Sequence, residues 1–374
     1  MSDGTDRGGP VLMNDFRAEP PELIGQELGA CERVIRSGWY VLGKEVEDFE
    51  RAWADKCASH HVVGVGNGMD ALEIGLRAVG IGPGDEVITT AMTAFATVLA
   101  ILRAGAIPVL ADIGKEDALL DMASARRCLS GRTKAVLLVH LYGRMPDMDA
   151  WRKFCAEHQL SLLEDCAQAH LAIWKGAKAG TFGTWGAFSF YPTKNLGALG
   201  DAGALITDSD EVATKARHLR NYGESERYHH TDLGLNSRLD ELQAAILSAR
   251  LNWLDRFIQH RRMVAERYYA EVQNPKVKLL SRPPTPENHV YHLFVVRCRE
   301  RDRLREHLKD LRVQTLIHYP LAIHHQPVAQ KLRTDPSGLR NAEAHAEECL
   351  SMPCHPQMGE ADISRVIQAL NSCE

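Results

Sequence analysis

The sequence has 374 residues, of which 45% are hydrophobic and 25% charged, and its formal net charge at pH 7 is −5. This length suits a large domain with a smaller one, and the composition is that of an ordinary globular protein. The acidic balance gives no reason to expect a nucleic-acid partner, no apolar run is long enough to span a membrane, and Met1–Pro10 is too polar for a signal peptide.

Cysteine and histidine spacing gives no sign of a metal site or a disulfide framework. The nine cysteines are an odd number, and no two are spaced as in a CxxC motif. Free thiols suit a reducing compartment, so we expect a cytoplasmic protein. Histidine doublets occur at residues 60–61, 229–230 and 324–325. None has a carboxylate or a further histidine at helical ligand spacing beside it, so we expect no metal.

The first part of the chain predicts helices that lead into a glycine-rich turn. We expect residues 1–12 to form a disordered leader and residues 22–35 and 44–59 to form amphipathic helices. A β-run at His61–Val65 is followed by Gly66-Asn-Gly68 and a helical pattern. The N–H groups and dipole of such a helix N-terminus favour a phosphate. A nicotinamide-dinucleotide site is the alternative, but the third glycine is missing from its expected place.

The next 150 or so residues alternate between strand and helix patterns, which is typical of βαβ units and of a mostly parallel sheet. The expected strands lie at 86–89, 106–112, 135–140, 160–164 and 203–207, and the expected helices at 93–104, 151–158 and 212–220.

Two charged residues follow strands in this region. Asp165 comes directly after the strand at 160–164, and Lys194 comes just after Pro192 at the end of an apolar run. Taken alone, Lys194 could be a surface lysine and Asp165 a helix N-cap. However, a carboxylate at the end of a parallel strand points into the ligand crevice. Pyridoxal phosphate (PLP) needs a restrained lysine for its Schiff base and a carboxylate opposite its pyridine nitrogen.

The remainder predicts a second, smaller unit. A polar loop from Arg220 to about residue 231 suits a flexible rim over a large ligand, and a long helix is expected at 238–257. We place the domain boundary after this helix. Residues 13–258 then form a large PLP-binding domain and residues 259–374 a small C-terminal α/β domain. Its expected elements are strands at 292–297 and 313–317, a helix from 301, and a helix at 360–370.

Four separated motifs occur in the order of the DegT/DnrJ nucleotide-sugar aminotransferases, and the resemblance runs from about residue 39 to 320. They are Asp165-x-x-Gln168, Phe188-Ser-Phe-Tyr-Pro-x-Lys194-Asn, Gly200-Asp-Ala-Gly203 and Gly234-x-Asn236-Ser-Arg-Leu-Asp-Glu-Leu-Gln243. The resemblance implies an α/β fold, the PLP-dependent transferase fold type I (aspartate-aminotransferase-like). That fold has a large, mostly parallel sheet domain and a small C-terminal α/β domain.

The resemblance also implies roles for individual residues. Lys194 would hold PLP as a Schiff base and move the proton, Asp165 would keep the pyridine nitrogen protonated, and Gln168 would hydrogen-bond the phenolic oxygen. The alternative for Gln168 is a core amide bonded to backbone. Ser189 would bind the phosphate.

Further phosphate contacts implied by the resemblance are the N–H groups of Gly68 and Met69, and Asn236 from a second subunit. Asn236 could also cap the following helix. This arrangement implies a homodimer in which each active site is shared. The family's usual Thr-aromatic-x-Ala-Thr pattern is changed here to Thr93-Ala94-Phe95-Ala96-Thr97. Either Phe95 stacks on the pyridine ring through a shifted backbone, or Ala94 leaves that face to another group.

The implied reaction moves an amino group from an amino acid, usually L-glutamate, to a nucleotide-linked keto-sugar. The motif around Asn236 and the stretch Gln314–Pro320 resemble the branch that acts on 3-keto-6-deoxy sugars. We therefore expect a dTDP-3-keto-6-deoxyhexose as substrate and a 3-amino sugar as product. Amination at C4 or of a UDP-sugar is the alternative. The residues expected to contact the substrate are Trp39, Tyr40, Tyr222, Arg238, His318 and Tyr319.

Two other functions of this fold agree less well with the sequence. A branch of the family deoxygenates sugars and has histidine in the lysine position, so Lys194 argues against that chemistry. A non-enzymatic regulator with the PLP fold is the second alternative, but no additional DNA-binding domain is visible in the sequence.

Overall fold

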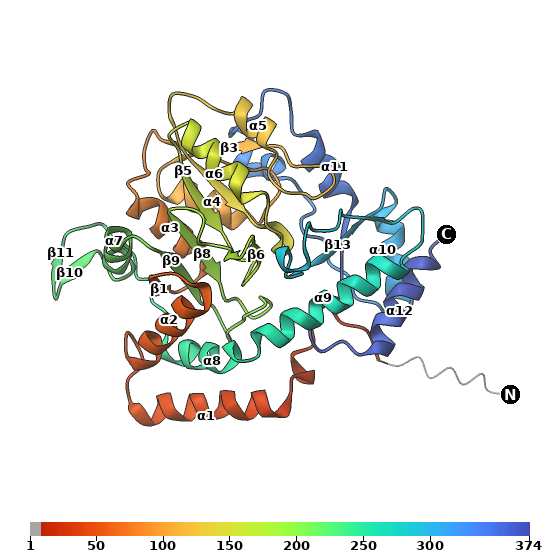
Figure 1. Ribbon diagram of the computed structural model, residues 1–374, viewed down its shortest axis with the longest axis horizontal. Helices are drawn as coiled ribbons and strands as arrows, with labels where there is room; N and C mark the ends of the chain where they lie inside the picture. Colours follow the sequence, from red (N-terminus) through yellow and green to blue (C-terminus); the bar gives the residue numbers. More distant parts are fainter. Residues whose placement is uncertain (1–8) are drawn as a thin grey trace.

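The structure, a computed structural model, describes residues 9–374 and is built around one sheet of eight strands (Figure 1). Its strand order is β1-β9-β8-β5-β4-β2-β3-β14. From β8 to β14 all neighbours are parallel, whereas β9 is antiparallel to both β8 and β1. The mostly parallel sheet predicted from the sequence is confirmed. The strands are β1 (His61–Val65), β2 (Glu86–Thr90), β3 (Ile107–Ala111), β4 (Thr133–Val139), β5 (Ser161–Asp165), β8 (Trp185–Ser189), β9 (Gly203–Thr207) and β14 (Arg333–Thr334).

Both faces of this sheet are buried because its strands are continuously apolar. Val62 of β1 packs into one hydrophobic cluster and its neighbour Val63 into another, and Val136 and Leu137 of β4 divide in the same way. Successive side chains of a strand point to opposite faces, so each strand supplies both cores. The covering helices are α2 (Lys44–Cys57), α3 (Gly68–Ala78), α4 (Phe95–Arg103), α5 (Met122–Arg127), α6 (Met148–Glu157) and α7 (Asp210–Arg220).

Three more helices lie along one side of the molecule, where α1 packs against α8 and α9 leads to the smaller unit (Figure 1). The single helix predicted at 238–257 is wrong, because the chain forms two helices there. The N–H of Trp253 bonds to the carbonyl of Arg250, three residues back, and this tight turn ends α8. The weak helix former Asn252 lies at the junction. These helices are α1 (Pro21–Ser37), α8 (Glu241–Leu251) and α9 (Leu254–Glu271).

The smaller unit is an antiparallel sheet of order β12-β13-β15 that packs against α9, α10 and α12. The strand predicted at 313–317 is wrong. Val313 bridges to Val11 whereas Leu316 bridges to Ser351, so the segment changes partner and forms no continuous ladder. The elements are β12 (Lys278–Leu279), β13 (Phe294–Arg297), β15 (Cys349–Met352), α10 (Arg301–Asp310) and α12 (Glu360–Asn371).

The beginning of the described chain packs into the smaller unit, and helix α9 crosses the predicted domain boundary. Residues 1–8 of the predicted leader lie outside the described residues, but Val11 is buried in the core of the smaller unit, so Val11 does not belong to a disordered leader. The division after residue 258 stays a prediction. Helix α9 crosses it, with Ile258 in the core of the large sheet and Val264 in that of the small one. The later segment β14 and the helix α11 (Arg340–Glu348) pack back against the large sheet.

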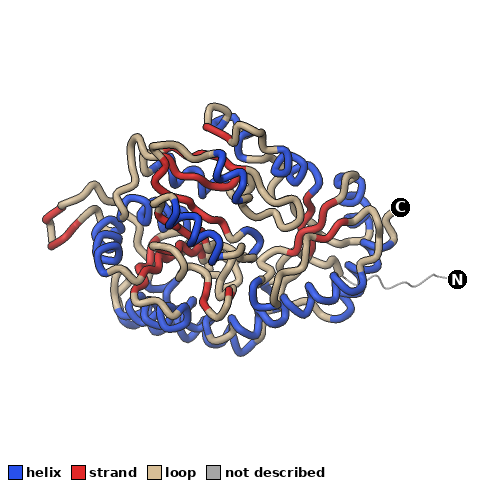
Figure 2. The backbone as a smooth tube through the Cα atoms, turned by 45° about the horizontal axis from the view of Figure 1, so that its top comes forward, coloured by secondary structure: helices blue, strands red, loops and turns tan. Residues whose placement is uncertain are grey.

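Two short hairpins complete the strands. The hairpin formed by β10 and β11 lies in the predicted polar loop and projects from the body of the molecule in both views (Figures 1 and 2). Within the described part of the chain, no helix has the length and apolar character needed to cross a bilayer. The hairpins are β6 (Ile173–Trp174) with β7 (Ala177–Lys178) and β10 (Glu224–Glu226) with β11 (His229–His230). The 3-10 helices are η1 (Phe16–Ala18), η2 (Leu141–Gly143), η3 (Pro286–Asn288), η4 (Ile323–His325) and η5 (Pro327–Ala329).

A buried ionic cluster joins α1 to α8. The guanidinium of Arg250 contacts the carboxylates of Glu19 and Glu27, with Nη1 2.5 Å from Oε1 of Glu27 and 3.1 Å from Oε2 of Glu19. All three side chains are buried. Removing the single cation would leave two carboxylates buried without a counter-charge.

We therefore expect Arg250→Ala to lower the free energy of unfolding by about 3–5 kcal/mol. The measurement is urea unfolding followed by circular dichroism. Arg217→Ala, which removes an exposed arginine of α7, is the matched control and should change the value by less than about 0.5 kcal/mol. Equal stability of the two variants would mean that the cluster does not hold α1 in place.

Candidate active site

Lys194 lies in a tight loop between β8 and β9. The loop closes through a hydrogen bond of 2.8 Å from the N–H of Phe190 to the carbonyl of Ala202, and the N–H of Lys194 bonds to the carbonyl of Tyr191 at 2.8 Å. The side chain is half-buried. Burial lowers the pKa of Lys194 to about 8, against the opposing effect of the nearby Asp165 charge. The chain therefore presents an amine that is partly neutral near physiological pH.

Asp165 ends the parallel strand β5, next to β8, and its side chain is buried. Oδ2 accepts a hydrogen bond from the Thr97 hydroxyl at 2.8 Å, and Oδ1 accepts one from the N–H of Ala167 at 3.1 Å. Burial raises the pKa of Asp165, while these two donors and the charge of Lys194 lower it. The adjacent strand ends thus bring an oriented carboxylate and an amine to one crevice.

The N-terminus of α3 approaches the end of β8 very closely. A Cβ placed on Gly68 would lie 2.6 Å from Cβ of Ser189, so no larger residue fits at position 68 without movement. Asn67 caps the helix, and its side chain accepts from the N–H of Asp70. The N–H groups of Gly68 and Met69 have no acceptor among the described residues. Two free donors and a serine hydroxyl therefore gather at a helix N-terminus, an arrangement that suits an anion.

Gln168 is buried and its amide is oriented by a backbone contact. Oε1 accepts from the N–H of Tyr142 at 2.6 Å, so the amide nitrogen must point the other way, where Nε2 donates to the Tyr319 hydroxyl at 3.2 Å. Burial raises the pKa of Tyr319 to about 12, and the charge of Asp165 adds to that effect. The structure thus brings the side chains of Gln168 and Tyr319 together, near enough to Asp165 for its charge to act on Tyr319.

The charge of Lys194 affects the pKa of three histidines that are buried or half-buried near it. Burial, with a further contribution from the charge of Lys194, lowers the pKa of His318 to about 4 and that of His170 to about 3. His292 is shifted in the same direction for the same reasons, so its pKa falls well below the usual value. All three rings are therefore neutral at pH 7. Nδ1 of His318 lies 2.8 Å from the Ser351 hydroxyl, which links the site to the smaller unit.

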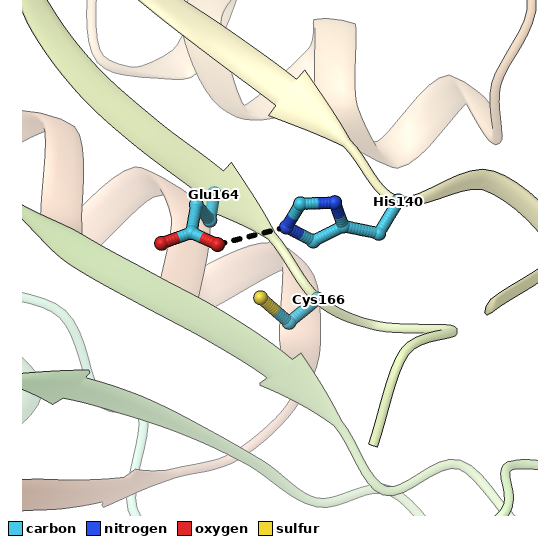
Figure 3. A group of neighbouring side chains, drawn as sticks. All are labelled: His140, Glu164 and Cys166. Atoms are coloured by element: carbon cyan, nitrogen blue, oxygen red, sulfur yellow. Dashed lines mark hydrogen bonds and ion pairs between the residues drawn. The ribbon is translucent and has the colours of Figure 1, made fainter. Parts of the chain in front are cut away.

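Beneath the site lies a closely packed group of His140, Glu164 and Cys166 (Figure 3). Nε2 of His140 is 2.8 Å from Oε2 of Glu164. The Glu164 carboxylate also accepts three backbone N–H groups at 2.8–2.9 Å, from residues 180, 182 and 183. Because its oxygens are already occupied, we interpret this group as a structural support for the loop at 180–183.

Of the predicted substrate residues Trp39, Tyr40, Tyr222 and Arg238, the last adjoins the turn before α3, because the neighbouring Ser237 hydroxyl accepts from the N–H of Gly66 at 3.0 Å. Arg238 donates to the Asn221 side chain at 3.1 Å and lies over the Tyr222 ring. Trp39, Tyr40 and Tyr222 are exposed. Within the described chain, no hydrogen bond joins any of these side chains to Lys194.

Asn236 lies on the same outer segment. It is exposed and forms an isolated bridge with Asn221. Asp240, not Asn236, occupies the N-cap position of α8, so the alternative capping role of Asn236 is wrong. The stretch at 39–41 lies beside this segment, since Val41 bridges to Asp240.

Some residues of the site were missed in the sequence. Thr97, Tyr142, His170 and His292 carry no local spacing that connects them to Asp165 or Lys194, and only the fold brings them there. Thr97 belongs to the Thr93-x-x-x-Thr97 pattern noted in the sequence, but that pattern does not predict its hydrogen bond to Asp165. Phe95, one of the two stacking alternatives, begins α4 and packs against a hydrophobic cluster of the large unit.

Two solved structures are similar to this chain over nearly its whole length. One is Streptomyces venezuelae DesV in complex with a ketimine intermediate, with a TM-score of 0.94, 41% identity, and coverage of 97% of this chain and 98% of that one. Another is NtdA from Bacillus subtilis with bound cofactor PMP, with a TM-score of 0.88, 29% identity, and coverage of 98% and 85%. The predicted aspartate-aminotransferase-like fold is thereby confirmed.

Relatives of similar length support the same assignment. The erythromycin biosynthesis sensory transduction protein EryC1 of Saccharopolyspora erythraea is 44% identical, with 96% of this chain and 98% of the relative covered. The dTDP-3-amino-3,4,6-trideoxy-alpha-D-glucose transaminase of Streptomyces venezuelae is 42% identical, with 95% and 94% covered. A model of the DegT/DnrJ/EryC1/StrS aminotransferase family matches residues 21–371. The chain belongs to the DegT/DnrJ/EryC1/StrS aminotransferase family.

Proposed function

We propose that this aminotransferase uses PLP to move an amino group from L-glutamate to C3 of a dTDP-linked 3-keto-6-deoxyhexose. The observation that carries the proposal is the pairing of a lysine of lowered pKa with a buried, oriented carboxylate at neighbouring strand ends. The sugar is inferred from a transaminase relative that is named for dTDP-3-amino-3,4,6-trideoxy-alpha-D-glucose, an amino sugar of the kind that transamination at C3 would give. The free thiols of all nine cysteines suit a cytoplasmic enzyme.

The residues present fit PLP. The free N–H groups of Gly68 and Met69, with the Ser189 hydroxyl, form a cradle that a phosphate would fill. Asp165 would face the pyridine nitrogen, and the Nε2 group of Gln168 would donate to the phenolic oxygen. When bound, PLP supplies a ring that accepts the electron pair left on carbon after loss of a proton.

Lys194 is the residue that we expect to carry protons during the reaction. Nζ of Lys194 would take the proton from Cα of the donor amino acid and, in the second half of the reaction, give a proton to C3 of the sugar. A pKa of about 8 makes both directions accessible near neutral pH.

Asp165 must stay ionised to favour a protonated pyridine nitrogen. Burial opposes this and raises the pKa of Asp165, whereas the hydrogen bond from the Thr97 hydroxyl at 2.8 Å acts in the opposite direction. Thr97 thus positions the carboxylate and favours its charged form.

A homodimer with shared sites is the proposed active unit. Asn236 and Tyr222 are exposed in the single chain, and the hairpin β10–β11 on the same segment projects from its body (Figure 2). In a two-fold dimer one self-complementary contact would bring this segment of each subunit to the site of the other. The exposed side chains of Trp39, Tyr40 and Tyr222 with the cation of Arg238 would then line the sugar-nucleotide pocket.

Incubation of the PLP-loaded protein with L-glutamate and dTDP-linked 3-keto and 4-keto 6-deoxyhexoses tests the reaction. We expect NMR of the product to place nitrogen at C3. Lys194→Ala should reduce the rate by at least about 10²-fold because the proton carrier is lost, whereas Lys175→Ala, at an exposed lysine of the β6–β7 turn, should not. Amination at C4 alone, or full activity of Lys194→Ala, would contradict the proposal.

Covalent capture of PLP should depend on pH through Lys194. Only the neutral amine attacks, so the capture rate of the apoprotein should rise with pH, with a midpoint near 8 and a plateau above it. Borohydride trapping followed by mass spectrometry of the Lys194 peptide gives the rate. Because the negative charge of Asp165 raises the pKa of Lys194, Asp165→Asn should move the midpoint to lower pH. Asp149→Asn, at an exposed carboxylate, is the control. A midpoint above 10 would be that of an ordinary lysine.

Subunit mixing tests the shared site. Inactive Lys194→Ala and inactive Asn236→Asp should together recover about a quarter of native activity, because half of the random dimers are mixed and each has one intact site. The charge introduced at position 236 would repel the phosphate. Lys194→Ala mixed with Asp165→Ala is the control and should recover nothing, since both residues come from one subunit. An inactive first mixture, with subunit exchange confirmed, rules out sharing through Asn236.

A further inference from the structure

Two histidines and a glutamate that are distant in sequence meet on the surface of the protein. Nε2 of His324, in η4, lies 3.0 Å from Oε1 of Glu343, in α11. Nε2 of His325 lies 3.9 Å from the same oxygen, and the two imidazole centroids are 4.1 Å apart. We propose that these three side chains bind Zn²⁺ or another first-row divalent cation that imidazole and carboxylate ligands accept.

The separations match those of ligands around one small ion. Zn²⁺ binds histidine nitrogen and carboxylate oxygen at about 2.0–2.2 Å, so neighbouring ligand atoms in a tetrahedral site lie about 3.3–3.6 Å apart. The observed 3.0 and 3.9 Å fall on either side of that range. All three ligand atoms lie within 4.8 Å of one another, so side-chain adjustment would complete the site, with water as the fourth ligand.

A hydrogen bond to Glu343 explains the position of His324 but not that of His325. Nε2 of His324 can donate to Glu343 at 3.0 Å, but His325 directs its own Nε2 to the same carboxylate oxygen from 3.9 Å, too far for a hydrogen bond. Two imidazoles that converge on one carboxylate are the donor set typical of zinc and other transition-metal sites. The side chain of His325 is 51% exposed and that of Glu343 is 41% exposed, so an ion can enter from solvent.

Both elements that carry the ligands are anchored to the large unit. The N–H of Ile323 bonds to the carbonyl of Ala91 at 2.9 Å, which holds η4. The N–H groups of Asn341 and Ala342 bond to the carboxylate of Asp112 at 3.0 and 2.8 Å, which holds the first turn of α11. The ligands are therefore placed before any ion binds. A bound ion would join η4 to α11 and so restrain the segment that follows His318 and Tyr319.

No local ligand spacing predicts this site, because Glu343 lies on a separate helix from the two histidines. The site is also different from the buried group of His140, Glu164 and Cys166, whose carboxylate oxygens already accept four hydrogen bonds. The proposed ion lies outside the Lys194 group, and the proposal does not depend on the aminotransferase substrate.

Titration of the tag-free, PLP-loaded protein with Zn²⁺, followed by calorimetry, tests the proposal. We expect one equivalent to bind per chain and the melting temperature to rise. His325→Ala and Glu343→Gln should each weaken binding by at least about tenfold without loss of the folded circular-dichroism signal. The double variant His229→Ala/His230→Ala removes an exposed histidine doublet that pairs with Glu226 and Glu224 across the β10–β11 hairpin but belongs to no metal-ligand group among the described residues, so it should leave binding unchanged.

A second probe reports on the ligands directly. Co²⁺ bound by two imidazoles and a carboxylate should give visible absorption bands that Glu343→Gln changes and that the 229/230 double variant does not. Absence of a stoichiometric site, or equal loss of Zn²⁺ binding in the 229/230 double variant, would overturn the proposal. So would Zn²⁺ affinity that is unchanged in both His325→Ala and Glu343→Gln.

Discussion

The interaction on which the site depends is the attraction between Asp165 and Lys194 in a largely dry crevice. Burial disfavours the charge on each of them, and each stabilises the charge of the other. The balance leaves a carboxylate that can remain ionised and an amine that loses its proton easily. Neighbouring parallel strands and one tight loop provide this geometry, because β5 and β8 end at the same edge of the sheet and the loop after β8 carries Lys194.

Much of the surrounding structure keeps that pair in place. The Thr97 hydroxyl fixes one oxygen of Asp165, and the Glu164 carboxylate, one residue earlier on the opposite face of β5, holds the loop at 180–183 through backbone N–H groups. The amide of Gln168 is oriented by Tyr142. Each of these polar side chains is buried and has a partner, so the crevice is rigid before any ligand arrives.

The sheet, its strand-end carboxylate and the lysine were predictable because they follow from apolar periodicity and from short motifs. Gly68 and Ser189 were also found in this way, and the structure places them in contact. Long-range contacts were not predictable. The hydrogen bond of Thr97 to Asp165 and the packing of Val11 in the small core join residues that no local pattern connects. The break between α8 and α9 was missed because it has no glycine or proline to mark it.

Helix α9 belongs to both hydrophobic cores, with Ile258 in one and Val264 in the other. Its buried Arg261 also donates to the backbone carbonyls of Tyr291 and Cys354 in the smaller unit. If α9 moved away from either core, its apolar residues in the other core would also be displaced and exposed. We therefore expect the two units to unfold together, so that a destabilising change in the small sheet also weakens the packing around Lys194.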